Sequence, residues 1–275
     1  MEFLQHKPSE ELAQHVETIM FFSGFMPDHE VERVVPTGHA FIIFELDGYT
    51  RHTFDNDTLK PNGTFTKVWI SGLHRNYLSI SAHTDSSMFV IQFKPHGAYP
   101  FLHKHMIELA EKIVPAEEVL GDDILHLRDD ITSATTPNEK FGLAEQWLKQ
   151  RYKPELNPST DLLDIINRLQ QEPVSNLNNI IEHFPHSQKH LIDLFKKYLG
   201  LTPKYYQRIL RFNEIMQRIQ HKEKVAWTDI AYSCGYSDQS HFIKEFKHFS
   251  GFNPKEFIDQ SHNSQSNFFP IDTSG

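Results

Sequence analysis

The last hundred residues contain an internal repeat, and this repeat limits the possible folds more than any other feature of the sequence. One copy spans residues 191–206 and the other spans residues 242–257, at a constant offset of 51 residues. In both copies a Phe-Lys pair is followed by a Gly and then by a Pro-Lys pair. The sequence therefore predicts two copies of one structural unit. The matched positions are Phe195 and Phe246, Lys196 and Lys247, Gly200 and Gly251, Pro203 and Pro254, and Lys204 and Lys255.

Each copy has the pattern of a helix that ends at the Gly, followed by a helix that begins at the Pro. Apolar residues recur at helical spacing before the Gly, which favours the left-handed conformation of a helix C-terminus. Pro fits the first position of the next helix. Short apolar segments at 177–183 and 228–233, each followed by a tight turn, lie upstream. A short helix, a turn and a Ser-capped second helix predict a helix-turn-helix. A connecting helix at 204–220 would be about 25 Å long.

The second unit also carries a longer run of specific residues. It reads Asp229-Ile230-Ala231, then Gly235-Tyr236-Ser237-Asp238-Gln239-Ser240-His241-Phe242, then Phe246-Lys247, Gly251 and Pro254. This run closely resembles the signature of the AraC/XylS family of bacterial regulators, and the resemblance covers roughly residues 160–260. The first unit fits the same pattern, with Pro185 where the family usually has Gly. The resemblance implies a sequence-specific DNA-binding transcription regulator. It also implies double-stranded DNA and RNA polymerase as partners.

In a helix-turn-helix the second helix lies in the major groove and its N-terminal residues contact base edges. Polar positions that do not face the core are therefore the expected base-reading residues: Ser187, Gln188, Lys189 and Asp193 in the first unit, and Ser237, Asp238, Gln239, Ser240, His241 and Lys244 in the second. The expected phosphate contacts are Lys196, Lys204, Arg208, Arg211, Lys247 and Lys255. A solvated helix face explains any one of these charges equally well. His241 could instead stack on Tyr236, and Arg211 could form a buried ion pair.

The first hundred residues predict a β-rich domain. Short apolar or alternating runs occur at 31–35, 40–46, 67–70, 77–82 and 88–94, separated by turn residues. Asp47-Gly48 predicts a hairpin between 40–46 and 49–54. Beyond Pro100, apolar residues at helical spacing predict helices at 101–113, 121–131 and 139–152. The expected fold class is α+β: a sandwich or barrel-like domain at 1–100, a helical extension at 101–153, an all-α domain with two helix-turn-helix units at 160–260, and a flexible tail at 261–275.

Charge is distributed unevenly along the chain. The formal net charge is −9, yet residues 187–255 hold 12 basic and 6 acidic side chains. This asymmetry suggests a basic, DNA-reading part attached to an acidic one. No apolar run is long enough to span a membrane, and the first residues lack the apolar core of a signal peptide. Cys234 is the single cysteine. These features predict a cytoplasmic protein without a membrane partner.

Other functions compete with DNA binding. Gly97, His103, His105 and Glu108 nearly match the metal motif of cupin enzymes, but a helix would point the two histidines in different directions. We therefore expect no metal, no cofactor, no catalytic residue and no enzyme activity. The metal-dependent cupin-like enzyme remains the alternative, together with a regulator that acts through protein contacts only. Segments at 34–39, 71–72 and 93–97 resemble N-terminal domains of some family members, which bind a small effector or form dimers. Trp69, Phe44, Phe89 and Phe93 would line an effector pocket or form ordinary core.

Overall fold

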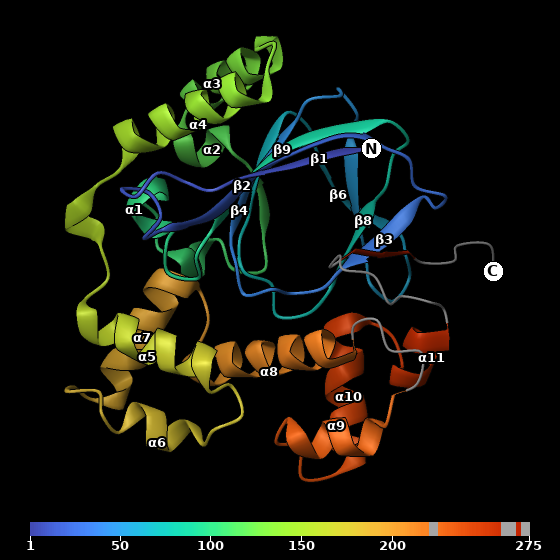
Figure 1. Cartoon of the computed structure of the whole chain (residues 1–275), viewed down its shortest axis with the longest axis vertical. Helices are drawn as coiled ribbons and strands as arrows, with labels where there is room; N and C mark the ends of the chain where they lie inside the picture. The colour runs from blue at the N-terminus through green and yellow to red at the C-terminus, as the bar shows by residue number, and fades with distance from the viewer. Residues whose placement is uncertain (220–224, 260–267, 271–275) are drawn as a thin grey trace.

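The computed structural model describes residues 1–219, 225–259 and 268–270. The N-terminal domain, our name for residues 1–153, is built on two antiparallel sheets, and one strand from near residue 270 joins the second of them (Figure 1). Sheet A has the strand order β1 (Glu2–His6), β2 (Val16–Phe25), β9 (Ser86–Phe93), β4 (Phe41–Glu45), β7 (Val68–Ser71) and β10 (Ile113–Pro115). Sheet B has the order β11 (Phe268–Pro270), β3 (Val31–Val34), β8 (Leu78–Ser81), β5 (Arg51–Phe54) and β6 (Pro61–Phe65).

Side chains of β4 alternate between two hydrophobic cores, as the pleat of a strand requires. Ile42 and Phe44 belong to the large core that sheet A shares with the helices. Ile43 belongs to a smaller cluster with Trp69 of sheet A and Ile80 of sheet B. Phe89 and Phe93 belong to the large core with Phe44, so Trp69 lies in a different cluster from the other three aromatic residues. The four residues therefore do not line one pocket.

The predicted hairpin at Asp47-Gly48 is wrong, because β4 and β5 lie in different sheets. β4 pairs with β7 and β9, whereas β5 pairs with β6 and β8. Gly48 has a positive φ of 83°, as a tight turn would need, but this turn leads the chain from sheet A to sheet B. The sequence thus predicted the turn correctly. The strands that pair with β4 are distant in sequence, so the turn residues do not specify them.

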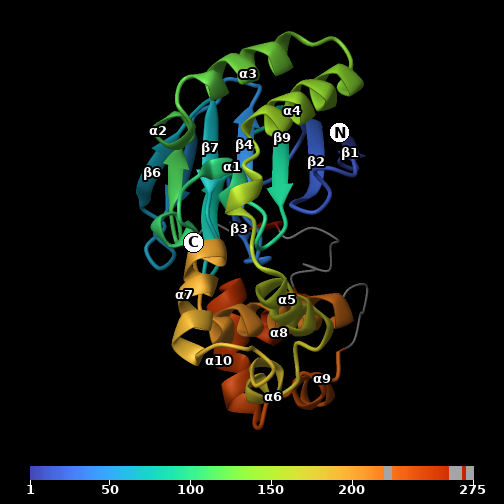
Figure 2. The same cartoon turned by 90° about the vertical axis from the view of Figure 1, so that its left-hand side faces the viewer.

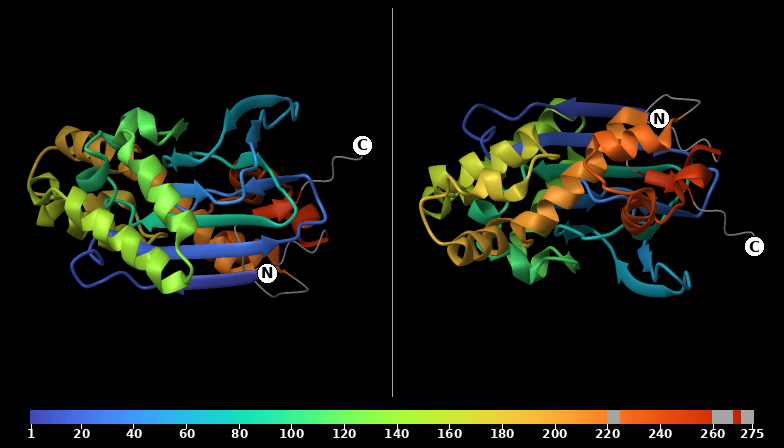
Figure 3. Two further views of the ribbon diagram at one scale, coloured as in Figure 1. Left: turned by 90° about the horizontal axis from the view of Figure 1, so that it is seen from above. Right: turned by 90° about the horizontal axis from the view of Figure 1, so that it is seen from below.

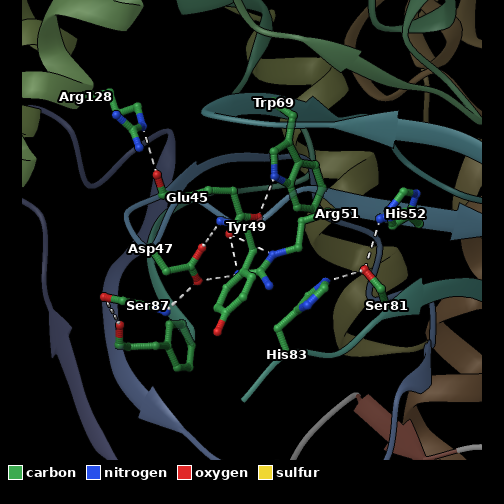
Figure 4. Close-up of polar contacts among 11 residues, drawn as sticks. Glu45, Asp47, Tyr49, Arg51, His52, Trp69, Ser81, His83, Ser87 and Arg128 are labelled. Carbon is green, nitrogen blue, oxygen red and sulfur yellow. Dashed lines mark hydrogen bonds and ion pairs between the residues drawn. The ribbon is translucent and has the colours of Figure 1, made fainter. Parts of the chain in front are cut away.

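A buried ion pair joins the two sheets next to this turn (Figure 4). Nη2 of Arg51 on β5 lies 2.7 Å from Oε2 of Glu45 and 2.6 Å from Oδ2 of Asp47. The indole of Trp69 donates to Glu45 Oε1 at 2.8 Å, and Nε of Arg128 donates to the Glu45 carbonyl at 2.8 Å. Burial raises the pKa of the Glu45 carboxyl, and Arg51 partly offsets this effect. The pair satisfies a charge that would otherwise be costly to bury.

The segment 101–113 does not form the single helix that its apolar spacing predicts. It contains the end of α1 (Tyr99–Leu102), a 3₁₀ helix η1 (Met106–Glu108) and the start of β10. His103 adopts the left-handed conformation and ends α1. Gly72, directly after β7, packs so closely on this segment that a Cβ would lie 2.0 Å from the Leu109 carbonyl oxygen. Close packing on sheet A thus overrides the local pattern. The two later helices are confirmed within about two residues at each end, as α3 (Asp123–Ser133) and α4 (Pro137–Arg151). The short helix α2 (Glu117–Leu120) and the 3₁₀ helix η2 (Pro154–Leu156) were not predicted.

The C-terminal domain is our name for residues 160–259, and its described residues form helices joined by turns and loops. The helices are α5 (Thr160–Gln171), α6 (Leu177–Ile181), α7 (Gln188–Leu199), α8 (Pro203–Ile219), α9 (Trp227–Ser233), α10 (Gln239–Ser250) and α11 (Pro254–Asp259). The two helix-turn-helix units, α6–α7 and α9–α10, are confirmed, and α8 connects them. Gly200 and Gly251 end α7 and α10 in the left-handed conformation, with φ of 78° and 77°. The predicted last residue of the connecting helix, Gln220, lies outside the described residues.

The chain returns to the N-terminal domain after α11. Of the tail predicted to be flexible, the structure describes residues 268–270, which form β11 and pair with β3. The prediction is wrong at these three residues because Phe269 is fully buried, with its ring centroid 4.9 Å from that of Phe257. A buried aromatic ring and a paired backbone stabilise this strand more than the polar composition around it suggests.

Candidate nucleic-acid interface

Both recognition helices, α7 and α10, point away from the N-terminal domain (Figures 1 and 2). Gly200, at the C-terminal end of α7, lies against the Met106 carbonyl of η1. The Gly251 carbonyl, at the end of α10, accepts a hydrogen bond from Nη1 of Arg33 at 2.9 Å. Each helix has 12 residues, so its N-terminal turn lies about 18 Å from this contact. The two N-terminal turns therefore lie on the side of the molecule away from the sheets.

The first recognition helix begins at Ser187, whose hydroxyl accepts a hydrogen bond from the His190 backbone N–H at 3.2 Å. Such caps satisfy an otherwise unpaired N–H of the first helical turn. Leu191 and Phe195 are buried in the core. All four predicted base-reading residues of this unit are exposed to solvent: Ser187, Gln188, Lys189 and Asp193.

The second recognition helix begins one residue later than predicted. Asp238, and not Ser237, caps α10: its carboxylate accepts from the His241 backbone N–H at 2.8 Å, and this hydrogen bond lowers the pKa of Asp238. The ring of His241 lies edge-on to Tyr236 at 5.3 Å, yet its side chain remains 54% exposed. The structural and base-reading interpretations of His241 are thus compatible. All six predicted base-reading residues are exposed: Ser237, Asp238, Gln239, Ser240, His241 and Lys244.

Two of the predicted phosphate contacts are engaged inside the protein. The Arg208 guanidinium pairs with the buried carboxylate of Glu245 and lies 4.5 Å from the ring centroid of Tyr205. The Arg211 guanidinium lies 5.7 Å from the ring centroid of Tyr236, and its Nε is buried without a hydrogen-bond partner among the described residues, so the buried ion pair considered for Arg211 is not seen there. Arg208 therefore connects α8 to the recognition helix, and we do not retain it as a phosphate contact. The sequence reasoning missed Glu245, because nothing in the local pattern shows that a charged residue on α10 faces α8.

The four lysines predicted to contact phosphates, Lys196, Lys204, Lys247 and Lys255, are all exposed to solvent. Lys196 and Lys247 lie in the last turns of the recognition helices, and Lys204 and Lys255 lie in the first turns of the helices that follow. Within each unit the two lysines thus flank the glycine between the helices. This arrangement gives both units the same pair of positive charges.

The described residues contain no group of three or more His, Cys, Asp or Glu side chains that could hold a metal ion. The argument against His103 and His105 assumed a helix, and that assumption was wrong. His103 is turned toward α4, where its Nε2 lies 3.0 Å from the Arg151 carbonyl oxygen. None of the described helices combines the length and apolar character needed to cross a bilayer.

Comparison with known proteins assigns the helical region. Residues 181–260 match a family described as a helix-turn-helix domain. This match includes both recognition helices and the connecting helix. Residues 181–260 thus form an AraC-type helix-turn-helix domain. Residues 4–115 match a separate family, described as a domain of unknown function (DUF6597).

The relatives of the AraC-type domain are transcription regulators. The HTH-type transcriptional regulator ArgR of Pseudomonas aeruginosa is 30% identical over 105 residues, which cover 37% of this chain and 31% of that protein. The HTH-type transcriptional activator RhaS of Escherichia coli is 35% identical over 81 residues, covering 30% of this chain and 29% of RhaS. The chain thus spans about a third of each of these two relatives. An uncharacterized HTH-type transcriptional regulator, YbfI of Bacillus subtilis, is 25% identical over 245 residues, which cover 82% of this chain and 86% of YbfI.

Solved structures of ToxT from Vibrio cholerae also show similarity. One of them, apo ToxT K231A, is 14% identical, covers 88% of this chain and 97% of its own, and has a TM-score of 0.46.

Proposed function

We propose that the protein is a cytoplasmic one-component transcription regulator, without enzyme activity, that binds double-stranded DNA through α7 and α10. One observation carries the proposal: the two recognition helices are docked by their C-terminal ends and present exposed polar N-terminal turns on the side away from the N-terminal domain. In this proposal the two turns enter successive major grooves, about 34 Å apart on one face of the duplex. One molecule then contacts two adjacent half-sites.

The repeat suggests which bases the two half-sites share. Gln188 and Gln239 occupy equivalent positions, 51 residues apart, at the first position of each recognition helix. Because the Gln amide pairs with adenine N6 and N7, we propose an adenine at the same place in both half-sites. Asp193 and Lys244 are also equivalent but opposite in charge. Asp accepts from cytosine and Lys donates to guanine, so the half-sites differ there. The operator is thus an imperfect tandem repeat.

Selection of genomic fragments bound by the full chain, followed by footprinting, tests this proposal. We expect protection of two successive major grooves per molecule, about 10 base pairs apart. Gln188→Ala should relax base preference in one half-site only, and Gln239→Ala in the other only, each at a cost of about 1–3 kcal/mol. Lys149→Ala is a matched control, because Lys149 pairs with Glu11 at 3.6 Å within the N-terminal domain. Protection of a single groove, or identical effects of both Gln variants, would contradict the proposal.

The N-terminal domain is proposed as the regulatory part, which either binds a small effector or pairs with a second copy of the chain. These two roles predict different behaviour in solution. A dimer gives twice the monomer mass by light scattering at all effector concentrations. A pure effector domain stays monomeric and gains thermal stability on binding, since a ligand that binds only the folded state stabilises it.

The two competing functions have separate tests. A regulator that acts through protein contacts alone, with RNA polymerase for example, would bind duplex DNA no better than an unrelated acidic protein does. A metal-dependent enzyme would retain metal after purification and dialysis, measured by elemental analysis. Stoichiometric metal would overturn the proposal that the protein has no enzyme function.

A further inference from the structure

The N-terminal domain contacts both copies of the repeat at the same place, the left-handed glycine that ends each recognition helix. A Cβ on Gly200 would lie 2.7 Å from the Met106 carbonyl oxygen of η1. A Cβ on Gly251 would lie 2.7 Å from the Tyr77 ring and 2.8 Å from the Arg33 guanidinium. The two glycines are equivalent positions of the repeat, 51 residues apart. One domain is thus docked against the C-terminal ends of both recognition helices.

The contact with the second unit centres on Arg33 of β3. Its guanidinium lies between two rings, 4.8 Å from the centroid of Tyr77 and 4.4 Å from that of Phe252. It also donates to the Gly251 carbonyl at 2.9 Å. Nε of Arg33 is buried without a hydrogen-bond partner among the residues that the structure describes. A desolvated guanidinium held by two rings and a carbonyl fixes the end of α10.

The contact with the first unit uses the same kind of interaction. Nζ of Lys197 on α7 lies 5.0 Å from the ring centroid of Tyr99 on α1. The Tyr99 ring packs perpendicular to Tyr198 at 5.3 Å. The end of α7 is thus held by α1 and η1, whereas the end of α10 is held by β3 and residue Tyr77. Different parts of the N-terminal domain thus hold the two units.

From these contacts we propose that the N-terminal domain acts as a brace that sets the relative orientation of the two recognition helices, with Arg33 as its positioning residue. The proposal rests on the proposed function, since orientation matters only if both helices enter DNA together. Each helix is held at one end and reads at the other, about 18 Å away. A tilt of 10° at the glycine moves the N-terminal turn by about 3 Å, more than a hydrogen bond tolerates. Small changes at the brace therefore alter how well two grooves are read at once.

The first experiment measures the brace without DNA. Spin labels on cysteines introduced by His183→Cys and Tyr232→Cys report the distance between the two units, and neither position is among the proposed base readers. Native Cys234 is fully buried, which disfavours its labelling. We expect one narrow distance distribution in the otherwise wild-type full chain and a clearly broader one with Arg33→Ala. Lys149→Ala should leave the width unchanged. An unchanged width in Arg33→Ala overturns the brace and leaves DNA binding unaffected as a proposal.

The second experiment measures its use in DNA recognition. Full-length protein is titrated with duplexes that carry the selected tandem site, either at its natural spacing or with five base pairs inserted between the half-sites. We expect the wild-type protein to prefer natural spacing at least tenfold, and Arg33→Ala to reduce that preference several-fold. Arg33→Lys should give an intermediate result, because a lysine keeps the charge but loses the flat stacking surface. Tighter binding by Arg33→Ala would show that the contact is inhibitory and would overturn the proposal.

Discussion

Salt dependence gives the sharpest quantitative test of DNA binding by this acidic protein. Four exposed lysines, Lys196, Lys204, Lys247 and Lys255, flank the glycines that end the recognition helices. If each contacts one phosphate, the logarithm of the binding constant should fall with the logarithm of salt at a slope of about −3.6. Raising monovalent salt from about 50 to 200 mM should then weaken binding about 150-fold. Fluorescence anisotropy with a labelled duplex measures this slope directly.

Single substitutions test which side chains produce the slope. Lys255→Ala should make it shallower by about 0.9 and weaken binding to all sequences by a similar factor, because a phosphate contact reads no base. Lys149→Ala removes the same charge from α4, where Lys149 pairs with Glu11, and should leave the slope unchanged. A slope near zero would refute phosphate binding by this surface. Equal effects of the two substitutions would instead show a response to net charge alone.

Three further predictions concern stability. Burial lowers the pKa of His15 and His96 to about 4, so below pH 6.5 the unfolded chain takes up protons that the folded protein does not. The free energy of unfolding should therefore decrease between pH 6.5 and 4 by about 1.4 kcal/mol per pH unit for each histidine. In urea titrations at several pH values, His96→Asn should remove the contribution of one histidine to this decrease. Gly200→Ala should lower the free energy of unfolding by about 1–3 kcal/mol in thermal denaturation, because Gly200 has a φ of 78° and η1 blocks a Cβ. The control Gly142→Ala should not destabilise the protein, because a Cβ there meets no atom within 4 Å. Phe246→Ala should cost about 3–5 kcal/mol by calorimetry, since the ring is fully buried; a cost below about 1 kcal/mol would contradict the core assignment.

The C-terminal domain could be predicted from sequence because its signals are local. Gly200 and Gly251 end their helices, and a polar cap begins each recognition helix, within about a dozen residues of the apolar pattern that they delimit. Apolar residues at helical spacing mark the buried face of each recognition helix. The remaining polar positions were therefore predicted to be exposed, as they are in the structure. The cap of α10 was misplaced by one residue because Ser237 and Asp238 are adjacent and both can cap.

The N-terminal domain was harder to predict because its structure depends on contacts between distant segments. Asp47-Gly48 specifies a turn but not the sheet that the next strand joins. That choice is fixed where Arg51 meets the buried Glu45 carboxylate and where β5 pairs with β8. The docking of Arg33 on Gly251 spans 218 residues of chain and leaves no local pattern. No periodicity or motif could have indicated it.

The short strand β11 has a practical consequence for dissecting the protein. Because its residues pair with β3, the last strand of sheet B comes from the far end of the chain (Figure 3). A fragment that spans residues 159–275 would carry an apolar strand, Phe269 included, without the sheet that shields it. Such a fragment invites aggregation, since an unpaired strand is a template for another chain. The isolated C-terminal domain is better produced with its C-terminus at Asp259.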